Sequence, residues 1–261
     1  MAALPGVCRA VKKDGTVYYR ASATYKNKHI SLGSYHTESD AHMAYIQAHS
    51  LLNGKQPVEA YRQEAAGLSF EKWVILVNFR DNGIYIKTPI YLKHRYFIYY
   101  IDQLTVLKFD VDDLFYYSNH KIMKRGGHLF VSDFGMQVNI LSRYGIRNFA
   151  VAGKDYRFSN GDSTDYRYGN IEIINRFYGV SQWMDKGRPI FITRIHINGD
   201  YIVGRYTREI EAAIAYNKAV AILRSKGIQK NYMTNYIDTI DEVEYASIYN
   251  KVRISRKLRD L

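Results

Sequence analysis

The sequence GSYHTESDAHMAYIQA, residues 33–48, combines the end of a strand with the start of a helix. Thr37 followed by Asp40 is the pattern of an N-terminal capping box, in which side chains satisfy the first free backbone amides of a helix. Small and aromatic residues then recur at helical spacing: Ala41, Ala44, Tyr45 and Ala48. Because alanines add little bulk to a helix face, we expect this helix to lie close against a sheet.

A second copy of this stretch lies near the other end of the chain. Residues 204–219, GRYTREIEAAIAYNKA, align with residues 33–48 without a gap and share a Gly, two Tyr, a Glu and three Ala. Upstream, Gly6-Val7 matches Gly179-Val180. The chain therefore contains an internal repeat, and we expect both copies to fold alike.

Segments in which side chains alternate between two faces, separated by turn residues, predict three strands before each helix. In the first copy the predicted elements are Gly6–Val11, Thr16–Tyr25, His29–Ser34 and a helix from Thr37 to about Leu52. In the second copy they are about Tyr178–Met184, Pro189–Ile197, Tyr201–Arg205 and a helix capped by Thr207 that ends near Lys226.

This pattern resembles the Apetala-type DNA-binding domain, which occurs in plant ethylene-response factors and in bacterial and phage homing endonucleases. The resemblance implies a three-stranded sheet in the major groove of DNA with a helix packed behind it. Because side chains alternate along a strand, one set should face the helix. These residues are Tyr19, Ala21, Ala23 and Tyr25 in the first copy, and Phe191, Thr193, Ile195 and Ile197 in the second.

The opposite sheet faces are the predicted DNA-binding surfaces. In the first copy the candidates are Arg9, Lys12, Arg20, Ser22, Thr24, Lys26 and His29. In the second copy they are Gln182, Trp183, Lys186, Arg188, Arg194, His196 and Arg205. Arg and Gln can read base edges and Lys more often holds a phosphate, although a solvated sheet face is the alternative. The family's basic positions are lost at Cys8 and Ala10 and near Asp200.

Between the copies, residues 156–180 read YRFSNGDSTDYRYGNIEIINRFYGV and resemble the core of HNH-type homing endonucleases. The matching frame is Asn160-Gly161-Asp162, Asp165, Arg167 and Asn170, although Asn-Gly can also form a simple turn. The resemblance places an acidic metal ligand and a general-base histidine where this chain has Arg157 and Phe158, and a second histidine where it has Ser142. Arginine repels a divalent cation and phenylalanine cannot accept a proton, so a binder without catalytic residues, metal or cofactor is predicted.

Two further groups of residues bear on this prediction. Asp110, Asp112 and Asp113 fit a helix N-terminus, where acidic side chains suit the helix dipole, with a metal cluster as the alternative. The candidates for a replacement base are His94, His120 and His128. Lone histidines more often serve packing or phosphate contact than catalysis.

The predicted fold class is α+β, with two three-stranded sheet-plus-helix domains flanking a β-rich, degenerate HNH-like ββα middle. The predicted domain boundaries are 1–55, 56–108 (linker and β-rich), 109–177 (HNH-like), 178–228 and 229–261 (C-terminal helix with a basic end). Within them, Phe70 to about Phe109 is predicted to be β-rich, with a hairpin turn at Asp81-Asn82-Gly83. The last helix is expected from a capping box at Thr239 to about Leu258, with Val243, Tyr249 and Val252 on its apolar face.

Net charge favours an anionic partner: the 261 residues carry a formal charge of +12. The lone Cys8 precludes an internal disulfide, and no run of 18 apolar residues is present, so we expect a cytoplasmic protein of a bacterial host cell with no membrane partner. Three functions remain open. They are a sequence-specific double-stranded DNA binder that regulates a phage or mobile element, an anti-CRISPR-type inhibitor of a protein–RNA defence complex, and a metal-dependent HNH endonuclease. The oligomeric state is left open.

Overall fold

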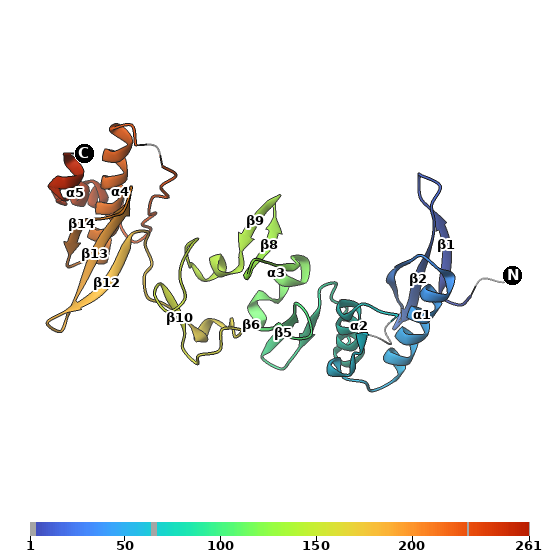
Figure 1. Ribbon diagram of the computed structural model, residues 1–261. Coiled ribbons are helices and arrows are strands. Elements are labelled where there is room, and N and C mark those ends of the chain that lie inside the picture. Colours follow the sequence, from blue (N-terminus) through green and yellow to red (C-terminus); the bar gives the residue numbers. More distant parts are fainter. Residues whose placement is uncertain (1–3, 64–66, 229, 261) are drawn as a thin grey trace. The chain divides into compact units, whose positions relative to one another are not determined.

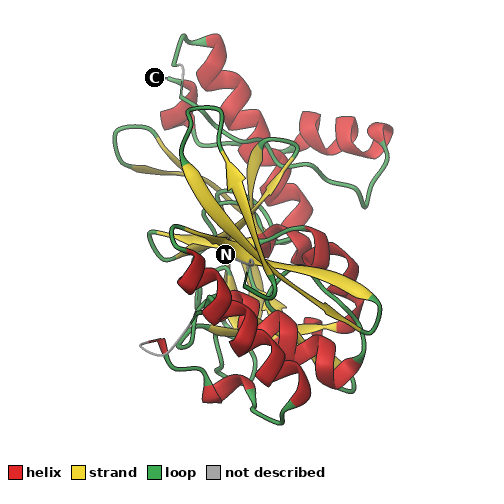
Figure 2. Cartoon of the chain, turned by 90° about the vertical axis from the view of Figure 1, so that its right-hand side faces the viewer, coloured by secondary structure: helices red, strands yellow, loops and turns green. Residues whose placement is uncertain are grey.

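The computed structural model describes residues 4–63, 67–228 and 230–260 (Figure 1). Helices and short antiparallel strands alternate along this part of the chain, which confirms the coarse α+β class (Figure 2). The chain divides into two compact units. One contains Met1–Ile140 and Asp162–Asn170, and the other contains Leu141–Gly161 and Ile171–Leu261.

The first copy of the repeat folds as predicted. Strands β1 (Val7–Val11), β2 (Val17–Tyr25) and β3 (Lys28–Tyr35) form an antiparallel sheet in that order, and α1 (Glu38–Asn53) packs on one face (Figure 1). The cap is also confirmed, because Thr37 Oγ1 accepts a hydrogen bond from the Asp40 backbone amide at 3.1 Å. Five alanines are buried where helix and sheet meet: Ala21, Ala23, Ala41, Ala44 and Ala48.

The second copy has the same architecture. Strands β12 (Val180–Asp185), β13 (Arg188–His196) and β14 (Asp200–Tyr206) pair in that order, and α4 (Glu209–Ser225) packs against them. The predicted cap at Thr207 is wrong, because Arg208 is the N-cap and makes no side-chain capping bond. Its guanidinium instead pairs with Glu244 at 3.4 Å.

A glycine packed against a tyrosine ring defines both copies. Gly6 has a φ of 75°, and a Cβ added to it would lie 2.0 Å from the Tyr45 ring. Gly179 has a φ of 71°, and a Cβ there would lie 2.3 Å from the Tyr216 ring. Only glycine accepts both the left-handed backbone and the close approach. The two glycine carbonyls also accept equivalent hydrogen bonds from central-strand amides next to the register shift with the third strand: Ser22 N to Gly6 O at 2.9 Å and Arg194 N to Gly179 O at 2.7 Å.

The prediction of strands from residue 70 is wrong at its start, because α2 (Phe70–Asn82) is a helix. Ser69 caps its first turn, and Gly83 ends it in the left-handed conformation instead of turning a hairpin. Every residue from Trp73 to Phe79 is buried. A helix that is apolar all round shows no helical periodicity, so its β-branched run resembles a buried strand.

The rest of the first unit contains two more three-stranded antiparallel sheets. Their strands are β4 (Ile90–Leu92), β5 (Tyr96–Tyr100) and β6 (Val106–Asp110), then β7 (Ile122–Arg125), β8 (His128–Asp133) and β9 (Met136–Asn139), with α3 (Leu114–Asn119) between the sheets in sequence. Phe97, Phe109 and Tyr117 are buried together, with the Phe109 and Tyr117 ring centroids 4.5 Å apart. Gly126-Gly127 and Gly135 lie in the turns of the β7–β8 and β8–β9 hairpins.

The second unit also contains a two-stranded pair and a C-terminal helical region. Strands β10 (Tyr156–Phe158) and β11 (Ile171–Ile173) are antiparallel. The last predicted helix is shorter than expected, since α5 spans Glu242–Lys251 with Asp241 as its cap, and a separate α6 spans Arg256–Arg259. Val243 is 79% exposed, so its predicted place on the apolar face is wrong, whereas Val252 is buried.

Candidate nucleic-acid interface

The face of the first sheet opposite α1 carries Arg20, Ser22 and Thr24, as predicted. Strand pairing sets Arg20 opposite Ser34, Ser22 opposite Ser31 and Thr24 opposite His29, and directly opposite residues share a face of the sheet. The Arg20 guanidinium donates to the Tyr18 hydroxyl, with Nη2 at 2.6 Å. The face is therefore rich in hydroxyl groups. The hydrogen bond to Tyr18 directs the Arg20 side chain along strand β2.

Two predicted contacts of the first sheet lie elsewhere. Arg9 pairs with Tyr19, whose ring packs on the helix side, so Arg9 belongs to the helix-bearing face. Lys26 turns towards α2, where its ammonium donates to the Arg80 carbonyl at 3.4 Å and lies 6.0 Å from the Phe79 ring centroid. Lys26 therefore complements the C-terminal end of α2, which explains its position.

The outer face of the second sheet is more strongly cationic and also more apolar. Pairing sets Trp183 opposite Ile190, and Ile192 opposite Arg205. Arg194 and His196 lie on the same face and are exposed, as predicted. The other predicted residues are exposed as well: Arg188 ends the β12–β13 hairpin opposite Asp185, and Lys186 lies in its turn with a φ of 48°.

Gln182 is a correction in the second copy. It pairs with Phe191, which packs on the core under α4, so Gln182 lies on the helix side of the sheet. Gln182 and Arg9 occupy equivalent positions in the two copies, and strand pairing places both on the helix-bearing face and not on the predicted outer face. His196 is paired through Nδ1 with Asp200 at 2.9 Å, which reduces the charge it can offer an anion.

Some residues on these faces were missed. Tyr18, Ser31 and Ser34 share the outer face of the first sheet, and Ile202 shares that of the second. Each third strand contains a bulge, at Leu32 in β3 and at Val203 in β14, which shifts its register with the central strand between Ala21 and Ser22 and between Thr193 and Arg194. The positions of β3 and β14 side chains depend on that shift, and the local sequence signal for it is the glycine inside each strand, Gly33 or Gly204.

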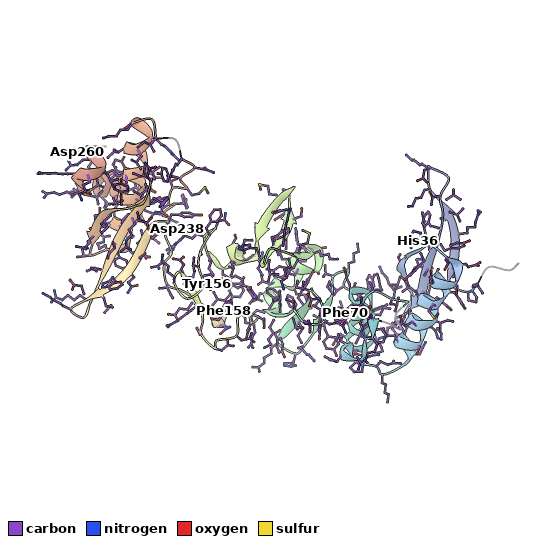
Figure 3. All side chains as sticks on the ribbon, in the orientation of Figure 1. His36, Phe70, Tyr156, Phe158, Asp238 and Asp260 are labelled. Carbon is purple, nitrogen blue, oxygen red and sulfur yellow. The ribbon has the colours of Figure 1, made fainter. Side chains whose placement is uncertain are left out.

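The HNH-like residues Arg157 and Phe158 lie in β10, within the second unit. Arg157 is opposite Glu172 and forms an ion pair with it at 2.7 Å. Phe158 and Tyr156 come from the same strand, with ring centroids 5.8 Å apart (Figure 3). The ββα arrangement is not found, because β11 ends at Ile173 and β12 begins at Val180 with no helix between them. Ser142 is exposed in a short 3₁₀ segment (Ile140–Tyr144) of the chain.

The carboxylates of the HNH-like frame lie in the first unit and are engaged by neighbouring side chains. Asp165 is fully buried and accepts two bonds from Arg167, at 2.8 and 2.6 Å. Hydrogen bonds from Thr164 and from the Lys108 ammonium lower the pKa of the Asp162 carboxyl to about 2. Asn170 donates to the Asp165 carbonyl at 2.8 Å. These residues therefore hold the 162–170 loop against β6.

Among the remaining metal and base candidates, Asp110 and His120 have local partners. Asp110 accepts a hydrogen bond from the Tyr168 backbone amide at 2.7 Å. His120 stacks on Tyr116, directs Nδ1 at the Tyr116 carbonyl at 2.9 Å and lies 3.5 Å from Asp133 through Nε2. Among the described residues, no group of three or more His, Cys, Asp or Glu side chains is placed to share a metal ion.

Comparisons of the chain with family models, with curated proteins and with solved structures find no match. Across the described segments, no helix combines the length and apolar character needed to cross a membrane.

Proposed function

We propose that this protein is a sequence-specific double-stranded DNA-binding protein that reads DNA with the outer faces of its two sheets. The observation that carries the proposal is the shared framework of the copies. Both keep a glycine–tyrosine contact and an alanine-faced helix on one side of the sheet, while the other side presents Arg20 or Arg194 to solvent. The major groove is about 12 Å wide and admits a two-stranded β-ribbon, so strands of each sheet can reach base edges there. The net charge of +12 supports an anionic partner.

The HNH-like segment is proposed to have no nuclease activity. Arg157 stands where the resemblance implies a metal ligand and is paired with Glu172, while Phe158 replaces the general base. We expect the double substitution Arg157→Asp with Phe158→His to give no DNA cleavage with magnesium. The variant still has Ser142 where the resemblance implies a histidine, and it still lacks a helix after β11. Cleavage by that variant in a plasmid-nicking assay would contradict this part of the proposal.

Binding without cutting suits a repressor or other regulator of a phage or mobile element. Two reading modules on one chain raise the effective concentration of the second once the first is bound, and they lengthen the site that is read. We propose this role over the anti-CRISPR-type inhibitor because the cationic sheet faces suit a duplex directly.

The test is selection from a random duplex library in the presence of magnesium, followed by sequencing of the retained DNA and inspection for breaks. Enrichment of one site in intact DNA is the expected result. Enrichment with breaks would support the endonuclease instead. Absence of enrichment, together with a protein–RNA complex retained from nuclease-treated host lysate, would support the inhibitor.

A further inference from the structure

A cationic cavity lies in the C-terminal region of the second unit, away from the residues assigned to base reading. Its volume is about 600 Å³, room for roughly 20 water molecules at about 30 Å³ each. Five cationic side chains line it: Lys218, Lys251, Arg253, Arg256 and Arg259. Among the residues that the structure describes, the lining contains no carboxylate; Asp260, which follows α6 and is labelled in Figure 3, does not line the cavity.

The C-terminal end of α5 needs a cation to satisfy its free carbonyl groups, and Lys218 supplies it. A helix C-terminus leaves carbonyl groups without partners, and a lysine can satisfy them. The Lys218 ammonium donates to the Tyr249 carbonyl at 2.7 Å and to the Val252 carbonyl at 3.0 Å, at the end of α5. The helix end is thus already complemented without Arg253, Arg256 or Arg259.

The three arginines are not used in ion pairs within the described residues. No carboxylate of this part of the chain lies within 4.0 Å of their guanidinium groups. Leu258, between two of them, is buried and anchors α6 to the core. Guanidinium groups fixed on an anchored helix around one cavity repel one another, and an oxyanion with several negative oxygens would relieve that repulsion.

The cavity continues towards the edge of the second sheet. The segment after α5 runs beside the edge strand β14, since Ser255 N donates to the Val203 carbonyl and Tyr206 Oη donates to the Arg253 carbonyl, both at 2.7 Å. A neighbouring cavity of about 540 Å³ is lined by Arg205, on the outer sheet face, by Arg253, and also by the acidic residues Glu211 and Glu244. Arg253 lines both cavities and so connects Arg205 on the sheet face with the cationic cavity, while the two carboxylates line only the neighbouring one.

We propose that this cavity binds consecutive phosphates of a DNA strand that passes the β14 edge of the second sheet. That the phosphates belong to DNA rests on the proposed function. That the cavity binds an anion rests only on the cationic side chains that line it. Phosphate contacts of this kind add affinity and fix orientation without reading sequence. The site would therefore extend the footprint beyond the bases read by the sheet.

The test uses the full chain and the variant Arg256→Gln with Arg259→Gln, which leaves Lys218 and Leu258 in place. The matched control, Lys87→Gln with Arg95→Gln, removes the same charge from exposed positions of the other unit. In the first experiment, thermal unfolding is followed with inorganic tripolyphosphate. We expect the anion to raise the melting temperature of the wild type and the control, and most of that rise to be lost in the variant.

In the second experiment, duplex binding is measured as a function of salt. Each neutralised phosphate contributes about 0.9 to the slope of log K against log salt, so the variant should lose roughly 1 to 2 in slope while the control keeps it. The enriched DNA sequence should not change.

Equal stabilisation of all three proteins by tripolyphosphate would overturn the anion site. A variant that loses this stabilisation yet keeps the wild-type salt slope would overturn DNA as its ligand. Wild-type protein that is stabilised by tripolyphosphate but binds no duplex would overturn both the proposed function and the DNA ligand, and leave the anion site standing.

Discussion

The two copies of the repeat share a framework but differ on the surface that the framework exposes. Both hold the glycine–tyrosine contact and the row of buried alanines. On the outer face, Ile192 in the second copy takes the position that Arg20 has in the first, and Arg194 takes that of Ser22. The comparison indicates that packing constrains one side of the sheet while the other varies, so the copies should prefer different DNA sequences.

The largest effect is expected where the framework admits only glycine. Gly6→Ala and Gly179→Ala should each lower the free energy of unfolding by about 2–5 kcal/mol, since the left-handed backbone costs about 1–2 and the ring overlap about 1–3. Urea unfolding measures the loss. Gly15→Ala is the control, because it has a φ of 85° but no atom within 4 Å of the added Cβ, and it should lose only about 1–2 kcal/mol.

A second substitution separates the two copies. At Gly6 the three nearest atoms belong to the Tyr45 ring, whereas at Gly179 the Arg194 carbonyl also lies 2.5 Å from the added Cβ. Adding Tyr45→Ala to Gly6→Ala should therefore cost less than the two single changes summed. Adding Tyr216→Ala to Gly179→Ala should recover less of the lost stability, because the clash of the added Cβ with the Arg194 carbonyl remains. Equal relief in both copies would contradict this difference.

The next effect concerns DNA binding by the two sheet faces. Arg20→Ala and Arg194→Ala should each weaken specific binding by roughly 1–3 kcal/mol, since each removes an exposed guanidinium from an outer face. Arg9→Ala and Gln182→Ala are the matched controls on the helix-bearing faces and should have much less effect. Fluorescence anisotropy with the selected duplex measures all four. Losses for the controls equal to those for the arginines would contradict the face assignment.

The helix caps should differ by a smaller amount. Thr37→Ala removes the side-chain cap of α1 and should cost about 1 kcal/mol in stability. Arg208→Ser adds a capping side chain to α4, which lacks one, but removes the exposed pair with Glu244, so it should be neutral or stabilising by up to about 1 kcal/mol. Thermal unfolding compares them, and destabilisation by Arg208→Ser would show that the copies do not share this helix geometry.

The smallest effect is a pH dependence specific to the second copy. Burial raises the pKa of Glu209, the first residue of α4, although Arg176 partly opposes it. A raised pKa in the fold means that ionisation disfavours the folded state at neutral pH. Glu209→Gln should therefore stabilise the protein slightly at pH 7, and the gain should disappear below about pH 4.5, where the carboxyl is protonated in both states. Urea unfolding of the wild type and Glu209→Gln at pH 7 and at pH 4 measures the gain, and an equal gain at both pH values would contradict its origin in the Glu209 carboxyl.

Much of the repeat could be predicted from sequence because its signals are local. Thr37 with Asp40 located α1, and the alternation around Ala21 and Ala23 identified the buried face of β2. The assignment failed for Arg9 and Gln182, whose faces depend on pairing with the next strand and not on their own neighbours. Register is a tertiary property of the sheet.

The middle of the chain was harder for a different reason. Helix α2 is buried on all sides, so its residues from Trp73 to Phe79 show no polar face. Ser69 before it and Gly83 after it are the local signals of a cap at each end, but Asp81-Asn82-Gly83 fits a hairpin turn equally well. The carboxylates of Asp162 and Asp165 were named as parts of a lost site, but their partners Lys108 and Arg167 follow only from how the loop folds onto β6.

The most direct test of the account is to select binding sites from a random duplex library with the wild type, Arg20→Ala and Arg194→Ala in parallel. We predict an intact two-part site for the wild type, with Arg20→Ala relaxing one part and Arg194→Ala relaxing the other. The same part relaxed by both variants, or an unchanged site in both, would contradict the claim that each sheet reads its own stretch of DNA.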